Sequence, residues 1–153
     1  MLDADESKGV LALSVVAGEP VAEKLGREPA HFAVRMSQAI RSLHECGGLL
    51  LPRFDWRDQQ RRTQPYAVAI VQRFPHLAPT VASIMATLAR LPSGWRPQPL
   101  VPIHGSLHSH QWLYDDAQDR IGLIDMDRAS LGDAENDVAT AVAEWDYVTK
   151  PFA

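Results

Sequence analysis

Hydrophobic residues recur every three or four positions between Ala30 and Cys46, a spacing that places them on one face of a helix. The residues on that face are Phe32, Met36, Ile40 and Leu43. Glu28-Pro29 precedes the pattern and Gly47-Gly48 follows it, as glycine does where a chain leaves a helix through a left-handed conformation. The pattern therefore predicts one long amphipathic helix.

Prolines divide the next part of the chain, at positions 65, 75, 79 and 92. Because proline disrupts a helix interior, they predict two separate helices, at Tyr66–Phe74 and Pro79–Leu91. The stretch Leu51–Arg62 is charged and without a clear period, so we expect it to be irregular. Ser93–Pro99 is expected to be a connector. Residues 28–92 thus form a helical region.

Short apolar runs indicate strands at both ends of the chain. Gly9–Val16 reads GVLALSVV, a partly β-branched run that predicts a buried strand. Further strands are predicted at residues 100–103, 111–114 and 121–124, with a hairpin turn at 115–120 and a last helix over 133–148. The predicted fold is mainly α with a small β-hairpin, an α+β class.

Composition limits the size and the partners of this fold. The 153 residues are 46% hydrophobic, enough for one core, so we expect a single domain over 1–153. The net charge of −4 is the reverse of what nucleic-acid binding requires. A local basic run contains Arg53, Arg57, Arg61 and Arg62, but Asp55 and Asp58 interrupt it, so it is interpreted as a solvated face.

The sequence also bears on the compartment. The single cysteine, Cys46, cannot form an internal disulfide, which favours a reducing environment. Met1–Lys8 is acidic and unlike a signal peptide, and no run approaches the roughly 18 apolar residues that span a membrane. A cytoplasmic protein without a membrane partner is predicted.

Polar residues of the types that carry out catalysis or bind metals lie close together in one interval: His104, Ser106, His108, His110, Gln111, Asp125, Asp127, Arg128, Asp133 and Asp137. From Ile103 to Ala139 the chain reads IHGSLHSHQWLYDDAQDRIGLIDMDRASLGDAENDVA. This interval resembles the aminoglycoside phosphotransferase and choline-kinase-like family, in which a His-Gly-Asp loop is followed by a hairpin, an Ile-Asp pair and a Gly-Asp pair. Gly9–Leu25 and Arg41–Gly48 resemble that family's hinge region and the end of its first long helix.

The resemblance implies the larger lobe of a protein-kinase-like fold that uses ATP and Mg²⁺ and transfers phosphate to a small hydroxylated substrate. It implies a hinge strand at 9–17, in which Ser14, Val15 and Val16 contact the nucleotide. Asp125 is the implied Mg²⁺ ligand, a hard oxygen donor of the kind that Mg²⁺ prefers. Gln111 stands where the family has asparagine and retains an amide oxygen as a second metal ligand. The catalytic and metal loops then occupy 100–137.

Ser106 departs from the family pattern, because an aspartate is expected there to accept or orient the proton of the acceptor hydroxyl. Serine is uncharged near pH 7 and cannot act as a carboxylate base, which predicts impaired or absent transfer. His104 is expected to pack behind this catalytic loop, and Arg128 to neutralise its acidic neighbours. Asp127 is either near a second metal or exposed, while Asp133 and Asp137 lie near a helix start, where Asp137 is expected to anchor the loop.

Two other interpretations stay open. In the first, the chain is a non-catalytic, pseudokinase-like binding module or a truncated remnant. In the second, it is a zinc-dependent hydrolase built on His104, His108 and His110. The resemblance also predicts that the N-terminal lobe, with its phosphate-covering loop and lysine, is largely absent. An exposed apolar face would then favour self-association.

Overall fold

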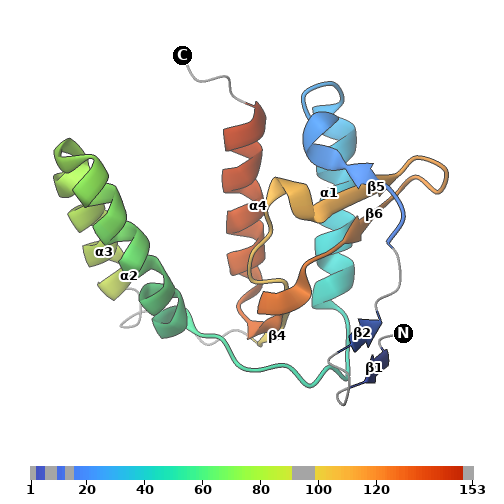
Figure 1. Cartoon of the computed structure of the whole chain (residues 1–153), viewed down its shortest axis with the longest axis horizontal. Coiled ribbons are helices and arrows are strands. Elements are labelled where there is room, and N and C mark those ends of the chain that lie inside the picture. The colour runs from blue at the N-terminus through green and yellow to red at the C-terminus, as the bar shows by residue number, and fades with distance from the viewer. Residues whose placement is uncertain (1–2, 6–9, 13–15, 91–98, 150–153) are drawn as a thin grey trace.

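The computed structural model of the chain describes residues 3–5, 10–12, 16–90 and 99–149. Two helices, α1 (Pro29–His44) and α4 (Ala134–Thr149), pack beside short strands, and a helical hairpin stands to one side of them (Figure 1). The fold is mainly α with small sheets, as the sequence predicts.

Helix α1 confirms the first predicted element. Pro29 occupies its first turn, where a missing backbone N–H costs nothing because that group has no helical partner. Phe32, Met36 and Ile40 are its buried residues, three members of the predicted apolar face. They join the core with Val21, Leu25, Leu107 and Trp112.

Short antiparallel strands carry the functional loops against α1. Strand β5 (Trp112–Asp115) lies between β3 (Glu19–Pro20) and β6 (Arg120–Leu123), and Trp112 pairs with Leu123. A separate pair joins β4 (Val101–Ile103) to β7 (Ser130–Gly132). The predicted strand–turn–strand element around residue 115 is therefore present, with a third strand added from the N-terminal side.

The N-terminal region forms one more hairpin, β1 (Asp3–Asp5) with β2 (Val10–Ala12). Strand β2 falls inside the predicted Gly9–Val16 run, whereas residues 13–15 lie outside the described residues. Val16 is half-buried and has no strand conformation. The predicted strand is thus present over residues 10–12.

The helical hairpin α2 (Trp56–Arg73) and α3 (Ala78–Arg90) corrects one prediction. Helix α2 starts ten residues before the expected Tyr66, so the stretch predicted to be irregular is largely helical. Asp55 caps it, accepting hydrogen bonds from the backbone N–H groups of Arg57 and Asp58, while Asp58 accepts one from the Asp55 N–H. This reciprocal capping stabilises the first turn of α2, which is rich in charged residues. Pro65 lies inside the helix without ending it.

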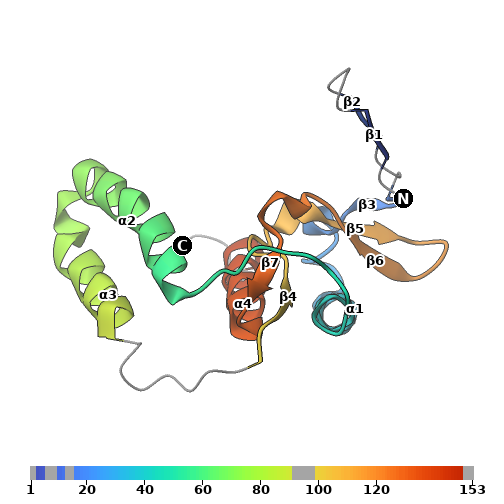
Figure 2. The ribbon, with the colours of Figure 1, turned by 90° about the horizontal axis from the view of Figure 1, so that it is seen from below.

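An extended segment leads from α1 to this hairpin, and Figure 2 shows α2 and α3 lying beyond α4. Residues 52–54 run along β7: the Phe54 N–H donates to the Leu131 carbonyl, and the Leu131 N–H donates to the Pro52 carbonyl. These bonds fix the start of α2 next to the metal loop. None of the helices in the described part of the chain is long and apolar enough to cross a membrane.

Candidate catalytic and metal loops

A buried carboxylate holds the catalytic loop, which follows β4. Asp137, in the first turn of α4, is fully buried. Its two oxygens accept hydrogen bonds from the backbone N–H groups of His104 (2.8 Å) and Gly105 (2.9 Å). His44 Nε2 lies 3.1 Å from the same carboxylate. The anchoring contact predicted for Asp137 is therefore present, and it ties the loop to both α4 and α1.

Gly105 brings the catalytic loop against the metal loop. Its φ of +76° lies in the left-handed region that favours glycine. A Cβ at this position would lie 2.6 Å from the Arg128 carbonyl oxygen. Only a residue without a side chain allows the two loops to approach this closely.

His104 supports the loops from behind. Its side chain is fully buried, and Nε2 donates to the Ile124 carbonyl oxygen at 2.9 Å, the bond that assigns the proton to this nitrogen. Nδ1 is buried and has no hydrogen-bond partner among the described residues. The position agrees with packing behind the catalytic loop and keeps the imidazole away from the surface.

Gln111 links the two loops directly. Its Nε2 donates to Asp125 Oδ2 at 2.7 Å, and its Oε1 accepts from the His108 backbone N–H at 2.9 Å. The backbone adds a bond from the Ile124 N–H to the Gln111 carbonyl at 3.1 Å. Asp125 is exposed and has a φ of +64°, which turns the chain sharply at the end of β6. Two positions fourteen residues apart thereby become neighbours.

The donor set around Asp125 fits Mg²⁺. Asp125 supplies one exposed carboxylate, a hard oxygen donor, and Mg²⁺ is commonly held by one or two carboxylates and its own waters. Asp125 has an oxygen that is not engaged by Gln111. For Gln111 to serve as the second ligand, its amide would have to turn over and release His108. In the arrangement shown, it orients Asp125.

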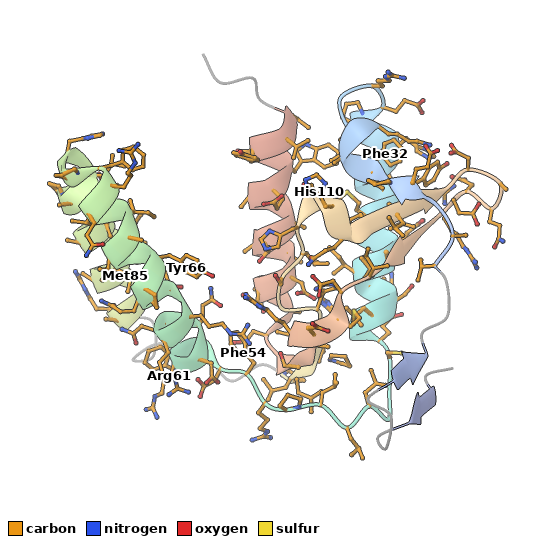
Figure 3. The ribbon with its side chains drawn as sticks, in the orientation of Figure 1. Phe32, Phe54, Arg61, Tyr66, Met85 and His110 are labelled. Carbon is orange, nitrogen blue, oxygen red and sulfur yellow. The ribbon has the colours of Figure 1, made fainter. Side chains whose placement is uncertain are left out.

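Ser106 lies at the edge of a small cavity between the catalytic loop and α2. The cavity has a volume of about 190 Å³, and its lining includes Gly105, Ser106, His108 and Arg128 from the two loops. Helix α2 contributes Gln59, Arg62, Thr63 and Tyr66. Figure 3 shows Tyr66 projecting from α2 on the side that faces α4. Ser106, which stands where the family has its catalytic aspartate, thus faces this cavity together with side chains of α2.

The comparisons with known proteins agree with this geometry. The model of the phosphotransferase enzyme family matches residues 1–152. The chain belongs to the phosphotransferase enzyme family. No match was found among curated proteins.

Solved structures show the same fold as this phosphotransferase-family chain. A choline/ethanolamine kinase family protein from Mesorhizobium loti is 18% identical with a TM-score of 0.61, over 96% of this chain and 49% of that one. Spectinomycin phosphotransferase APH(9)-Ia, solved with ADP and spectinomycin, is 13% identical with a TM-score of 0.58, over 91% of this chain and 52% of that one. The chain spans about half the length of these structures.

The remaining predicted site residues of this phosphotransferase-family chain are less closely gathered. Of the hinge residues, Ser14 and Val15 lie outside the described residues. Val16 packs over β6, because its Cγ1 occupies the place that a Cβ on Gly122 would take. Arg128 is exposed in the metal loop, beside the catalytic loop. Burial, together with the nearby carboxylates of Glu135 and Asp55, raises the pKa of Asp133.

His104, His108 and His110 do not form a zinc site. No three His, Cys, Asp or Glu side chains gather at metal-binding distances in the parts of the chain that the structure describes, which include all these histidines. His108 instead lies 3.3 Å from Glu144, and His110 is exposed. The zinc hydrolase interpretation is therefore wrong for this arrangement.

Two functional supports were missed from the sequence. His44 reaches Asp137 from 93 positions away, and Glu144 accepts from the Ser109 backbone N–H at 3.1 Å. Burial alone would raise the pKa of Glu144, but the hydrogen bonds from Ser109 and His108 together lower it below its usual value. Only the placement of Glu144 on α4, two turns after Asp137, hinted that it faces the same loop.

Proposed function

We propose that this chain binds ATP with Mg²⁺ and transfers phosphate to a hydroxyl of a small molecule, at a rate limited by Ser106. The observation that carries the proposal is the Gln111–Asp125 hydrogen bond, which joins the loop of the catalytic position to the loop of the metal position. Family membership supports the reaction class, and the ADP bound by APH(9)-Ia supports nucleotide use.

Each loop has a separate task in this proposal. Asp125, oriented by Gln111, would hold Mg²⁺, which neutralises phosphate charge when it is bound. Ser106 would donate or accept one hydrogen bond with the acceptor hydroxyl and so position its oxygen for attack on phosphorus. As that oxygen bonds to phosphorus, the bond from phosphorus to the ADP oxygen breaks.

The acceptor proton has no carboxylate to receive it at Ser106 and must pass to solvent or to the transferred phosphate. Loss of a positioned base costs about 10²–10⁴ in rate. Slow transfer is therefore expected of the natural chain. Gly105 and Asp137 keep the loop in place whichever residue stands at 106.

A non-catalytic binding module is the second candidate, and Ser106 itself favours it. The two candidates share the metal loop and differ in turnover. A module would bind nucleotide with Mg²⁺ and show no transfer even when the missing carboxylate is supplied.

The test compares the natural chain with Ser106→Asp and Ser106→Asn, measuring ADP release and phosphorylated product across a panel of hydroxylated acceptors. We expect the aspartate variant to be faster by about 10²-fold or more, because a base is restored. The asparagine variant has the same size without the charge and should stay slow. Equal rates for all three would contradict the role given to position 106.

Two further features belong to this proposal. Exposed apolar residues on α4, including Val138 and Val142, support self-association between copies of the chain. Sedimentation at micromolar concentration should show oligomers, and a clean monomer would contradict the proposed self-association.

The single cysteine, together with ATP as the proposed phosphate donor, favours the cytoplasm.

A further inference from the structure

Arginines gather beside the Ser106 cavity, at the base of α2. Four of them, Arg53, Arg61, Arg62 and Arg128, line a second cavity of about 420 Å³. Arg62 and Arg128 also line the cavity that contains Ser106, so the two cavities adjoin at these side chains. Three of the four come from the basic run whose interrupting aspartates predict a solvated face, and the fold brings Arg128 to them.

The charge of the larger cavity is opposite in sign to the net charge of the whole chain. The larger cavity is lined by four arginines and two aspartates, Asp58 and Asp127, a formal excess of two positive charges in a chain of net charge −4. Asp58 is occupied, since it pairs with Arg61 and accepts the Asp55 N–H. Within the described residues, no carboxylate lies within ion-pair distance of Arg53, Arg62 or Arg128.

The fold also holds one of these arginines in position. The Arg62 guanidinium lies over the Phe54 ring, 4.2 Å from its centroid. Phe54 is buried and is fixed by its backbone bond to Leu131. Stacking leaves the edge of a guanidinium free to donate hydrogen bonds, and that edge matches the two oxygens of a carboxylate or phosphate. Figure 3 shows Phe54 and Arg61 at the same end of α2.

We propose that the acceptor is a hydroxylated molecule that carries an anionic group, bound by Arg62 and Arg128 beside Ser106. This rests on the proposed function and names its substrate class: a carboxylate or a phosphate on a hydroxylated small molecule, rather than a polycationic one. Asp125, the proposed metal ligand, lines neither cavity. The arginines therefore serve a site beside the metal, on the acceptor side.

The experiment titrates the chain, without nucleotide, with four probes that share one hydroxylated skeleton: glycerol 3-phosphate, glycerate, glycerol and 3-amino-1,2-propanediol. Binding is measured by NMR shifts and calorimetry. We expect the binding of at least one anion to saturate while that of the neutral and cationic probes does not. Higher salt should weaken the binding of the anion. Comparing the two anions identifies phosphate or carboxylate as the preferred group. Equal binding of all four probes would overturn the proposal.

Variants then locate the anion. Arg62→Gln and Arg128→Gln should each weaken the affinity for the anion about tenfold or more. Arg73→Gln, at the far end of α2 and lining neither cavity, should change that affinity less than about twofold. Thermal unfolding checks that each variant is folded, and exposed Arg128 provides the variant with the least effect on packing. Unchanged affinity in both cavity variants would overturn the proposal.

A competition separates acceptor from nucleotide. With ATP and Mg²⁺ at saturation, the anion should still bind with its original affinity, and displacement by ATP would mean that the arginines hold nucleotide phosphates instead. A further pair of results is an anion that binds in an Arg62-dependent way and a Ser106→Asp variant that transfers no phosphate to any acceptor. That pair of results would support the anion site and contradict the proposed function.

Discussion

The catalytic frame and the helical hairpin of this protein are built in different ways. The catalytic frame, defined here as residues 101–137, contains side chains with no exposed surface, including Ile103, Leu107, Trp112 and Asp137. The hairpin α2–α3 buries only Ala67 among its helical residues, and its helices contact mainly each other. Few buried contacts mean a low free energy of local opening.

The difference separates two tasks. The phosphate transfer proposed for this chain would need its metal and acceptor positions held in fixed relation, and in the frame the Gln111–Asp125 bond joins the two loops that would carry them. The hairpin carries Arg61, Arg62 and Tyr66, which line the two cavities on the proposed acceptor side. We infer that the frame is preformed and that the hairpin beyond the fixed start of α2 adjusts to what binds.

The largest expected effect comes from removing the anchor of the frame. Asp137→Ala leaves the buried His104 N–H and the partly buried Gly105 N–H without an acceptor, and it should cost about 3 kcal/mol or more of the free energy of unfolding. Urea unfolding followed by tryptophan fluorescence measures it. Asp127→Ala, an exposed carboxylate of the neighbouring loop, is the control and should change stability by less than about 0.5 kcal/mol. Equal losses would contradict the anchoring role.

A smaller effect is expected where the two loops of the frame meet. Gly105→Ala introduces a Cβ against the Arg128 carbonyl at a positive φ and should cost about 1–3 kcal/mol. Gly47→Ala, where a Cβ meets nothing within 4 Å, is the matched control and should be nearly neutral. The same urea unfolding distinguishes them, and an unaffected Gly105→Ala chain would show that the loops are not held together.

In the hairpin, a comparable change should act locally. Asp55→Ala removes the cap of α2 and should cost about 1 kcal/mol. Hydrogen exchange should show faster opening of α2 with little change in α1 and α4, because the hairpin shares few buried contacts with the frame. Uniform acceleration across the chain would mean that both regions unfold together.

The smallest effect concerns pH. The pKa of Glu144 is lower in the folded chain than in the unfolded chain, so its stabilisation is present above the pKa of the unfolded chain and is lost as pH falls through the folded value. Glu144→Gln should therefore be less stable than the natural chain at pH 7, by less than about 1 kcal/mol, and the gap should close in acid. A stability difference between the two chains that does not change with pH would contradict this role of Glu144.

How much the sequence predicts depends on whether a contact is local. Helix α1 is recoverable because its buried residues follow the helical period, and β5 and β6 because a turn separates two apolar runs. The start of α2 was missed because its first turns are charged and Pro65 suggested a break, although Asp55 and Asp58 form a recognisable capping pair. The partner of Asp137 on α1, His44, is 93 positions away and depends on how the helices pack.

We propose that the frame holds nucleotide through a metal at Asp125. The most direct test is calorimetric titration of the chain with ATP, with and without Mg²⁺, beside Asp125→Asn. We predict binding that requires both ATP and Mg²⁺ and that weakens at least about tenfold in the variant. Binding that ignores Mg²⁺ or the substitution, or no binding under any condition, would contradict the account.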